Sequence, residues 1–328
     1  MREDKEALLE GILICSNAQC LSEYPVIDGI PVLVTELRTY IAQNIGPLLK
    51  RTDLSSTLES LLGDCCGPGS AFDVQRQHLS TYVFNHYADF DTDAGTVAEF
   101  TSSSIASVLG KGLSLIDGIP EGPLLDLGCS VGRTTFELAR NSKDLVLGVD
   151  LNFSMLQMAV SIMNSHTATY DRKRSGIVFE RRHFPVDLPR SEAVDFWACD
   201  ATNLPFADAG TALGISLNLL DCVSSPFDHL RELCRVLRPG GSALVSTPYD
   251  WSAYATAVES WLGGHSQRAN NQGRSAEILR SLFADGGHPS ALEALTLVAE
   301  EDSVPWTLRL HDRSVMTYFA HMVAGRKK

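Results

Sequence analysis

The sequence has no apolar run of the about 20 residues that a membrane-spanning helix needs. Residues 1–6 are mostly charged and so lack the apolar core of a secretory signal. We therefore expect a cytoplasmic protein without membrane contact. The 328 residues, 44% of them hydrophobic, suffice for one large globular domain and a smaller appendage.

Basic residues are scarce relative to acidic ones. The chain has 27 Lys and Arg against 40 Asp and Glu, and its formal net charge is −13. Before residue 121, seven basic side chains stand against sixteen acidic ones. Proteins that bind nucleic acid normally present a basic face, because phosphate contacts supply much of the affinity. A nucleic-acid partner is disfavoured, although a local basic patch would suffice for one.

The eight cysteines are scattered along the chain rather than grouped. Four of them fall in or beside predicted strands and helices: Cys129, Cys199, Cys222 and Cys234. In a reducing compartment such residues are expected to be buried thiols rather than disulfides.

The chain also lacks one glycine of the dinucleotide pattern G-x-G-x-x-G, because Asp126–Gly132 reads D-x-G-x-x-x-G. Residues 124–127 predict a short strand buried on both faces, and 134–139 predict a helix. A strand, a glycine turn and a helix in this order direct backbone N–H groups toward a ligand. Gly128 and Gly132 would let the backbone lie against that ligand.

Two further acids follow predicted strands. The strand predicted over 145–149 ends in Asp150, 22 positions after Gly128. This is about the spacing at which a carboxylate meets ribose hydroxyls in nucleotide-binding folds. A third predicted strand ends in Asp200, and Leu237–Gly241, reading L-R-P-G-G, predicts a sharp turn from helix to strand.

These four motifs, in this order, resemble the class I S-adenosylmethionine-dependent methyltransferases from about residue 81 to the C-terminus. The resemblance implies an α/β fold, a doubly wound, Rossmann-like sheet of seven strands. In that family the glycine turn holds the methionine part of the cofactor, Asp150 binds the ribose hydroxyls and Asp200 binds the adenine amine. The implied cofactor-binding residues are Tyr82, Asp126, Gly128, Cys129, Ser130, Gly132, Arg133, Asp150, Leu151, Asp200, Ala201 and Asn218.

Residues 11–34 predict a β-hairpin in which two β-branched runs flank Asp28-Gly29, a strong turn signal. The segment resembles the small zinc-ribbon-like domain of proteins that partner or precede methyltransferases. Cys15 and Cys20 could be half of a zinc site, but the next cysteines are the adjacent Cys65 and Cys66, which chelate one ion poorly. We favour a metal-free remnant, and divide the chain into an N-terminal hairpin and helical module (1–70) and a methyltransferase domain (71–328).

The remaining periodicities predict further elements on either side of these motifs. Helices are expected over 36–64, 74–87, 96–116, 152–164, 226–237 and 275–284, and strands over 212–218, 242–247, 292–300 and 315–324, with a loop over 304–313. Residues 171–190 hold six basic side chains and form the one candidate nucleic-acid patch. We prefer a solvated insertion there, because stacking aromatics are few.

A narrower resemblance concerns the mercaptohistidine N-methyltransferase domain of ovothiol-biosynthesis enzymes. It rests on 126–139, on Asn218–Asp221, on the Pro-Tyr-x-Trp cluster near residue 249, on 304–311 and on the aromatic stretch Tyr82–Tyr87, which here has an inserted Asn85. The resemblance implies a small imidazole or thiol acceptor. The implied acceptor-side and catalytic residues are His86, Asn218, Asp221, Tyr249, Asp250 and His311, with Trp251 and Trp306 in an aromatic wall.

Methyl transfer needs mainly alignment of the acceptor with an activated methyl group, and a base only if the acceptor must lose a proton. Two other functions stay open. One is an RNA or protein methyltransferase that uses the hairpin module to bind its substrate. The other is a non-catalytic protein that binds the cofactor, which the retained polar and aromatic strand ends at 218–221 and 249–251 oppose.

Overall fold

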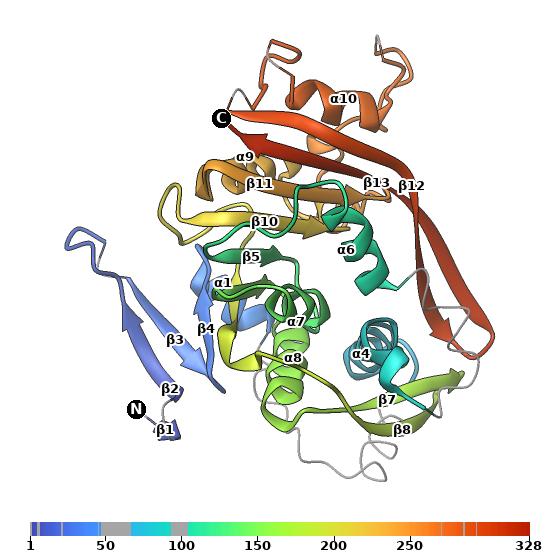
Figure 1. Cartoon of the computed structure of the whole chain (residues 1–328). Coiled ribbons are helices and arrows are strands. Elements are labelled where there is room, and N and C mark those ends of the chain that lie inside the picture. Colours follow the sequence, from blue (N-terminus) through green and yellow to red (C-terminus); the bar gives the residue numbers. More distant parts are fainter. Residues whose placement is uncertain are drawn as a thin grey trace.

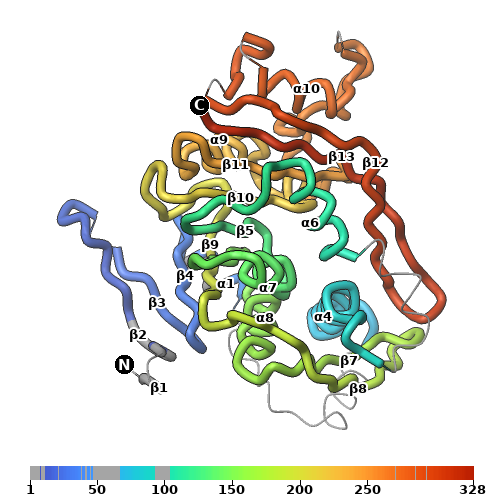
Figure 2. Tube along the Cα trace, viewed as in Figure 1, coloured from blue at the N-terminus to red at the C-terminus, as the bar shows by residue number. Residues whose placement is uncertain are grey.

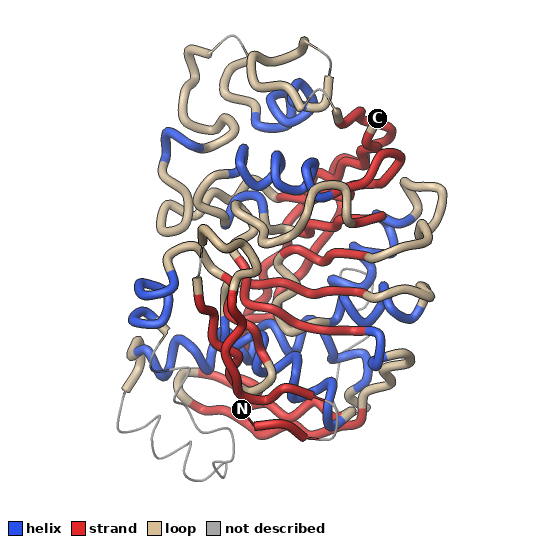
Figure 3. The backbone as a smooth tube through the Cα atoms, turned by 90° about the vertical axis from the view of Figure 1, so that its left-hand side faces the viewer, coloured by secondary structure: helices blue, strands red, loops and turns tan. Residues whose placement is uncertain are grey.

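The computed structural model describes residues 2–4, 7–20, 22–44, 46, 67–92 and 104–328, apart from 270, 285 and 293. Within these ranges one mixed sheet of eleven strands crosses the molecule (Figures 1 and 3). In order across the sheet the strands are β1 (Arg2–Asp4), β2 (Ala7–Ile14), β3 (Glu23–Ile27), β4 (Ile30–Leu33), β9 (Val194–Cys199), β6 (Val146–Asp150), β5 (Leu124–Leu127), β10 (Thr211–Leu217), β11 (Leu237–Thr247), β13 (Ser314–Lys327) and β12 (Leu295–His311).

Helices cover both faces of this sheet and enclose two cores. One core is shared by α1 (Leu37–Gln43), α4 (Ala71–Tyr87), α6 (Ile105–Leu113), α7 (Arg133–Arg140) and α8 (Phe153–Ser165), and the other by α9 (Pro226–Val236) and α10 (Ser275–Leu282). The described residues also include single turns of 3₁₀-helix: η1 (Ala88–Phe90), η2 (Ser191–Ala193), η3 (Leu220–Cys222) and η4 (Val258–Ser260). Because both faces are covered, every residue of β5 and β10 is buried.

The predicted α/β architecture is confirmed, but the sheet is larger than the seven strands that we expected. Strands β9, β6, β5, β10 and β11 are parallel, and β13 returns antiparallel beside β11. The count differs because the N-terminal strands continue the same sheet. Strand β4 pairs parallel with the outer edge of β9, with Val32 opposite Ala198.

The predicted hairpin turn lies between β3 and β4. Asp28 and Gly29 have φ values of 52° and 79°, as a two-residue type I′ turn requires, and they set Ile27 opposite Ile30. Ile30 and Val32 are fully buried in the core that α8 shares. The hairpin therefore packs on the main sheet, and the division of the chain at residue 70 stays a prediction.

Cys15 and Cys20 lie beside the start of this hairpin. Among the described residues no group of three or more His, Cys, Asp or Glu side chains could hold a metal ion, and Cys65 and Cys66 lie outside them. We predict that native mass spectrometry of the whole protein finds no zinc, and that a chelator leaves the melting temperature unchanged. One bound zinc that is lost in Cys15→Ser would contradict the metal-free assignment.

The C-terminal hairpin differs most from the sequence prediction. The segment expected as a loop, 304–313, belongs largely to β12, which pairs with β13 along most of its length. Pro305 and the register shifts along β12 hide the two-residue period of a strand. A proline is tolerated there because β12 is the edge strand of the sheet.

The expected insertion at 171–190 is also regular structure. Most of it forms an antiparallel pair, β7 (Thr167–Ser175) and β8 (Val178–Pro185). The far end of β12 and β13 curves toward this pair, as Figure 2 shows, and the Asp312 N–H donates to the Arg174 carbonyl at 3.2 Å. The predicted turn at 237–241 likewise belongs to β11. Parts of the helices predicted over 36–64 and 96–116 lie outside the described residues.

Candidate active site

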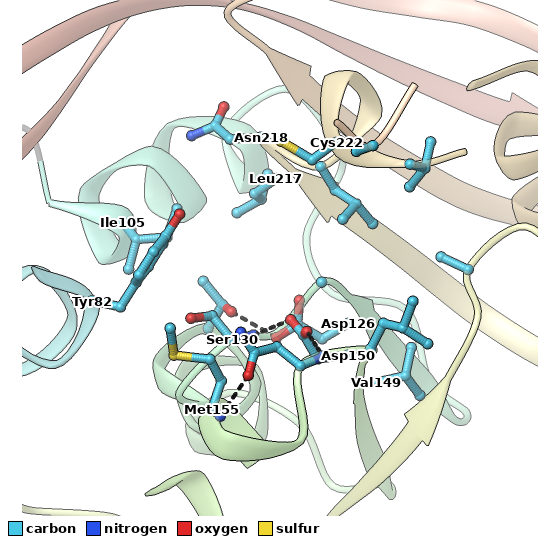
Figure 4. A pocket seen from close by; sticks show the side chains of 18 of the residues that line it. Tyr82, Ile105, Asp126, Ser130, Val149, Asp150, Met155, Leu217, Asn218 and Cys222 are labelled. Atoms are coloured by element: carbon cyan, nitrogen blue, oxygen red, sulfur yellow. Dashed lines mark hydrogen bonds between the residues drawn. The ribbon is translucent and has the colours of Figure 1, made fainter. Parts of the chain in front are cut away.

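A cavity of about 650 Å³ opens at the carboxyl ends of the central parallel strands. We call it the strand-end pocket; Figure 4 shows it from close by. Its volume lies within the about 300–1,000 Å³ of small-molecule sites. The residues predicted from the sequence that line it are Tyr82, His86, Asp126, Gly128, Ser130, Asp150, Leu151, Asp200, Ala201, Asn218 and Trp306.

The glycine turn between β5 and α7 forms the floor of the strand-end pocket. Gly128, Ser130 and Gly132 have φ values of 74°, 53° and 87°, in the left-handed region that favours glycine. The N–H groups of Gly128 and Cys129 donate to the Val149 carbonyl at 2.8 and 3.0 Å, which ties the turn to β6. Of these residues Gly128 and Ser130 line the pocket, whereas Cys129 and Gly132 support the turn from behind.

Asp150 ends β6 and faces the glycine turn across the pocket floor. One carboxylate oxygen accepts the Ser130 N–H at 2.9 Å and the other accepts the Asn152 N–H at 2.7 Å. Each oxygen has two lone pairs, so both can still accept a hydroxyl of a ligand. Burial raises the pKa of this carboxyl, while the backbone hydrogen bonds lower it.

Two more acids line the pocket. Asp126 accepts hydrogen bonds from the hydroxyls of Thr134 and Thr135 at 2.6 and 2.7 Å. Burial raises its pKa to about 6 against these two bonds. Asp200, after β9, accepts the N–H and the hydroxyl of Thr202 at 2.8 and 2.7 Å.

Arg133 was expected among the cofactor contacts, but it does not line the pocket. Its guanidinium donates to Asp89 at 2.7 and 2.8 Å, to Glu137 at 2.9 Å and to the His86 carbonyl at 2.7 Å. The Tyr87 hydroxyl donates to the Val131 carbonyl at 2.7 Å. These contacts fasten the end of α4 onto the glycine turn, which holds Tyr82 and His86 over the pocket.

The side of the pocket opposite the carboxylates is neutral. Burial lowers the pKa of His86 to about 3, helped by the Arg133 charge, and raises the pKa of Tyr82 to about 12. Burial also raises the pKa of the Cys222 thiol to about 12. At neutral pH none of these three side chains is charged. His86 is a weak base there, so its predicted role as a proton acceptor stays a prediction.

Five predicted acceptor-side residues lie outside the lining of the pocket: Asp221, Tyr249, Asp250, Trp251 and His311. Asp221 is buried behind it and accepts the Asp250 N–H at 2.7 Å, and burial raises its pKa to about 6. The Tyr249 hydroxyl is 2.7 Å from His321 Nδ1, on the sheet side. His311, at the end of β12, accepts the Arg313 N–H at 3.2 Å. Their part in catalysis stays a prediction.

Several lining residues were not predicted from the sequence. Most carry small or apolar side chains without a motif signal: His78, Ile105, Asn152, Met155, Cys222, Val223, Ser224 and Ala255. Asn152, the N-cap of α8, could have been found from its place before the helix. Phe153, the first residue of α8, is fully buried in the core beside this cap.

Four of the six basic side chains of 171–190 are engaged in ion pairs. Arg172 and Arg174 both contact Glu180, at 2.7 and 2.6 Å. Asp171 is paired by Arg76 and by Arg181, and Arg182 contacts Asp91 at 2.6 Å. Pairing with acids removes much of the positive potential that a nucleic acid would require.

Comparison with known proteins agrees with this geometry. Residues 125–245, from β5 through the glycine turn and both acid-bearing strands into β11, match a family described as a methyltransferase domain. Over these residues the chain is therefore similar to an S-adenosylmethionine-dependent methyltransferase domain. S-adenosylmethionine is the methyl donor of such a domain, and the glycine turn with Asp150 is where we predict that it binds. None of the helices in the described part of the chain has the length and apolar character needed to cross a bilayer.

Three curated proteins are similar to this chain. Phthiotriol/phenolphthiotriol dimycocerosates methyltransferase 1 of Mycobacterium ulcerans is 29% identical over 49% of this chain and 56% of its own length. The biotin biosynthesis bifunctional protein BioHC of Cellvibrio japonicus is 30% identical over 55% of this chain and 33% of its own length. The uncharacterized methyltransferase AN0656 of Emericella nidulans is 26% identical over 58% of this chain and 70% of its own length. The chain thus spans about half the length of the first of these relatives and about a third of the length of the second.

Solved structures give weak likenesses. A geranyl diphosphate methyltransferase in complex with GPP and sinefungin has a TM-score of 0.45 at 13% identity, over 72% of this chain and 81% of that one. The PH0226 protein of Pyrococcus horikoshii has a TM-score of 0.42 at 18% identity, over 75% and 97%.

The raised pKa of Asp126 predicts a pH dependence of cofactor binding. In the free protein this carboxyl holds its proton below about pH 6 rather than below its ordinary 3.8. The cationic sulfonium favours the ionised form, so binding lowers the pKa and releases the proton. The affinity for S-adenosylmethionine should therefore rise as the pH increases toward 6 and be level above it.

Calorimetry at pH values below and above 6 measures the affinity for S-adenosylmethionine and, for comparison, the affinity for S-adenosylhomocysteine. The second ligand lacks the sulfonium charge, so its affinity should have a smaller slope against pH. Asp126→Asn should flatten the slope for the cationic ligand. Equal slopes for the two ligands would contradict the assignment of the effect to charge.

Proposed function

We propose that the protein transfers a methyl group from S-adenosylmethionine to a nitrogen or sulfur atom of a small metabolite, of the imidazole or thiol type. The strand-end pocket carries this proposal, because its two sides differ in chemistry. Asp126, Asp150 and Asp200 gather on the side that fits the cofactor. Tyr82 and Asn218, an aromatic and a neutral polar side chain, lie away from Asp126 and Asp150 in Figure 4, and Trp306 also lines the pocket.

The chemistry asked of this chain is mainly positioning. The cofactor supplies a methyl group that is already activated for displacement, so the protein must align an acceptor atom with it. The clamp of Arg133 and Tyr87 fixes α4, and thereby one wall of the acceptor side. The neutral wall suits an acceptor whose lone pair is free at neutral pH, such as an imidazole nitrogen, because no charged base faces it.

A product cation would also be accommodated. Trp306 and Tyr82 present aromatic faces, and Trp306 stacks on Tyr318 with ring centroids 5.3 Å apart. Asp221 lies behind this wall and supplies negative charge above about pH 6, the value to which burial raises its pKa. An imidazolium product fits these surroundings better than an anionic one.

Methylation of RNA or protein is less well supported. A macromolecular substrate would need an open, charged groove beside the pocket, whereas the four arginines of β7 and β8 are paired with acids. A non-catalytic role as a cofactor-binding partner is opposed by the acceptor side itself, which would have no use without a second ligand.

Incubation with labelled S-adenosylmethionine and separate pools of imidazole, thiol and phenol metabolites tests the proposal. We expect label in an imidazole or thiol compound and none in total RNA or protein extract. Label only in RNA or protein would refute the small-metabolite assignment. Arg133→Ala should lower turnover by releasing α4, while Arg231→Ala, an exposed arginine of α9, serves as control.

A further inference from the structure

Four polar side-chain atoms on residues that line the strand-end pocket are buried and have no hydrogen-bond partner in the described part of the chain: His86 Nδ1, Ser130 Oγ, Asn218 Nδ2 and Trp306 Nε1. The last two, an amide nitrogen and an indole nitrogen, can only donate. Buried polar atoms without a partner are rare, and each costs about 1–3 kcal/mol. Both atoms are shielded from solvent, so bulk water does not satisfy them. Two such atoms on residues of one pocket indicate a ligand group that accepts hydrogen bonds.

The orientation of the Asn218 amide is fixed by Ser246 on the neighbouring strand. The Asn218 backbone N–H donates to the Ser246 carbonyl at 2.8 Å, and the Ser246 hydroxyl donates to Asn218 Oδ1 at 2.9 Å. The hydroxyl also accepts the Asn218 N–H at 3.1 Å, so its own proton is committed to Oδ1. The amide therefore keeps its NH₂ group as the free end. The residue holds this pose at a φ of 55°.

Trp306 is fixed by packing rather than by hydrogen bonds. It lies in β12, is 8% exposed and stacks on Tyr318 at an interplanar angle of 26°. An indole nitrogen is a donor only, so it can pair with nothing but an acceptor atom. In Figure 4 the hydroxyl end of Tyr82 and the Asn218 side chain lie on the same side of the pocket, away from Asp150.

We infer that Asn218 and Trp306 bind a carboxylate or carbonyl oxygen of the methyl acceptor, and so select acceptors that carry such a group beside the methylated ring or thiol. This inference rests on the proposed function, whose acceptor it narrows. Donors without charge of their own are well suited to a carboxylate, since a hydrogen bond to an ionised acceptor is about twice as strong as a neutral one. An amine in the same place would confront two donors and be excluded.

Three probes separate the possibilities: histidine, histidinamide and histamine share the imidazole but carry a carboxylate, a carboxamide and no oxygen. The chain has four tryptophans, so its ¹H–¹⁵N spectrum contains four indole signals. Trp306→Phe identifies its own signal by loss and keeps a ring to stack on Tyr318. In the complex with S-adenosylhomocysteine, the Trp306 signal should move with histidine or histidinamide and stay still with histamine.

Formate and acetate extend the probes to the bare carboxylate. A Trp306 signal that does not shift with any oxygen-bearing probe, or that shifts equally with histamine, would overturn the inference. The two donors would then bind a buried water molecule. Trp251→Phe is the matched control, because Trp251 Nε1 is also buried and unpartnered but the residue does not line the pocket. It should leave the response to the probes unchanged.

Kinetics separates this inference from the proposed function. With an acceptor that is turned over, Asn218→Asp, which replaces the donor by an acceptor, and Trp306→Phe should each raise KM about tenfold or more. The affinity for S-adenosylhomocysteine should change less than twofold in Trp306→Phe. Methylation of a metabolite with an unchanged KM in both variants would refute the inference alone, whereas label only in RNA or protein would refute the proposed function.

Discussion

Replacing Asp150 with alanine is expected to weaken S-adenosylmethionine binding by about 10- to 100-fold, because a hydrogen bond to a charged group contributes about 1.5–3 kcal/mol. The carboxylate has two tasks in the pocket. Its oxygens already fix the N–H groups of Ser130 and Asn152, and its remaining lone pairs can accept hydroxyls of the cofactor. Alanine removes both the ligand contact and the order of the two loops.

Calorimetry on the folded variant measures the loss. Asp150→Asn separates the two tasks, because the amide keeps one acceptor oxygen and the shape but loses the charge, so its affinity should lie between those of the wild type and alanine. Asp187→Ala, an exposed acid paired with Arg140, is the control for charge alone and should bind normally. Unchanged affinity in a folded Asp150→Ala would contradict the placement of the cofactor.

The cofactor side was predictable from the sequence because its signals are local. A buried strand, a glycine turn and a helix occur within Pro123–Ala139, and the next strand carries its acid at a set distance. The structure brings Gly128, Asp150 and Asp200 to one pocket, since parallel neighbours end at the same edge of a sheet. Backbone geometry alone imposes this arrangement.

The acceptor side depends on contacts between distant segments, and the sequence indicated it less well. Trp306 reaches the pocket because β12 is a strand that extends, paired with β13, beyond the end of β11. The sequence predicted a loop there, because Pro305 and the register shifts hide the two-residue period of a strand. Tyr249 and Asp250 follow a central strand, but the turn after β11 directs them toward His321 and Asp221. Their position after a strand predicted that Tyr249 and Asp250 would line the pocket, but the local turn places both residues outside its lining.

The N-terminal segment shows the same limit. Asp28-Gly29 determined its hairpin, because a two-residue turn with positive φ is encoded locally. Its attachment to β9 is a pairing of residues more than 160 positions apart, Val32 with Ala198. This pairing becomes visible in the structure, where Ile30 and Val32 are buried in the common core.

Gly132→Ala is expected to cost about 2–5 kcal/mol of folding stability, the largest effect of any single methyl group considered for this chain. About 1–2 kcal/mol arises from the φ of 87°, which an alanine adopts poorly. A further 1–3 kcal/mol arises from overpacking, because the new Cβ would lie 2.6 Å from Cζ of Phe196. Phe196 cannot yield easily, since it is fully buried and packs edge-on against Phe136 at 5.5 Å.

Thermal unfolding with and without S-adenosylhomocysteine tests this result. The melting temperature should fall by roughly 3–7 °C, because an unfolding entropy of about 2.1 cal/mol/K per residue gives about 1.5 °C per kcal/mol for a chain of this size. The cofactor should restore little of this loss, because the glycine turn to which we assign it is displaced. Gly110→Ala is the matched control: this glycine lies within α6 with nothing near its missing Cβ, so alanine should stabilise by about 0.5–1 kcal/mol. Equal melting temperatures for the two variants would show that the glycine turn tolerates a side chain, and that its close contact with Phe196 does not constrain the cofactor site.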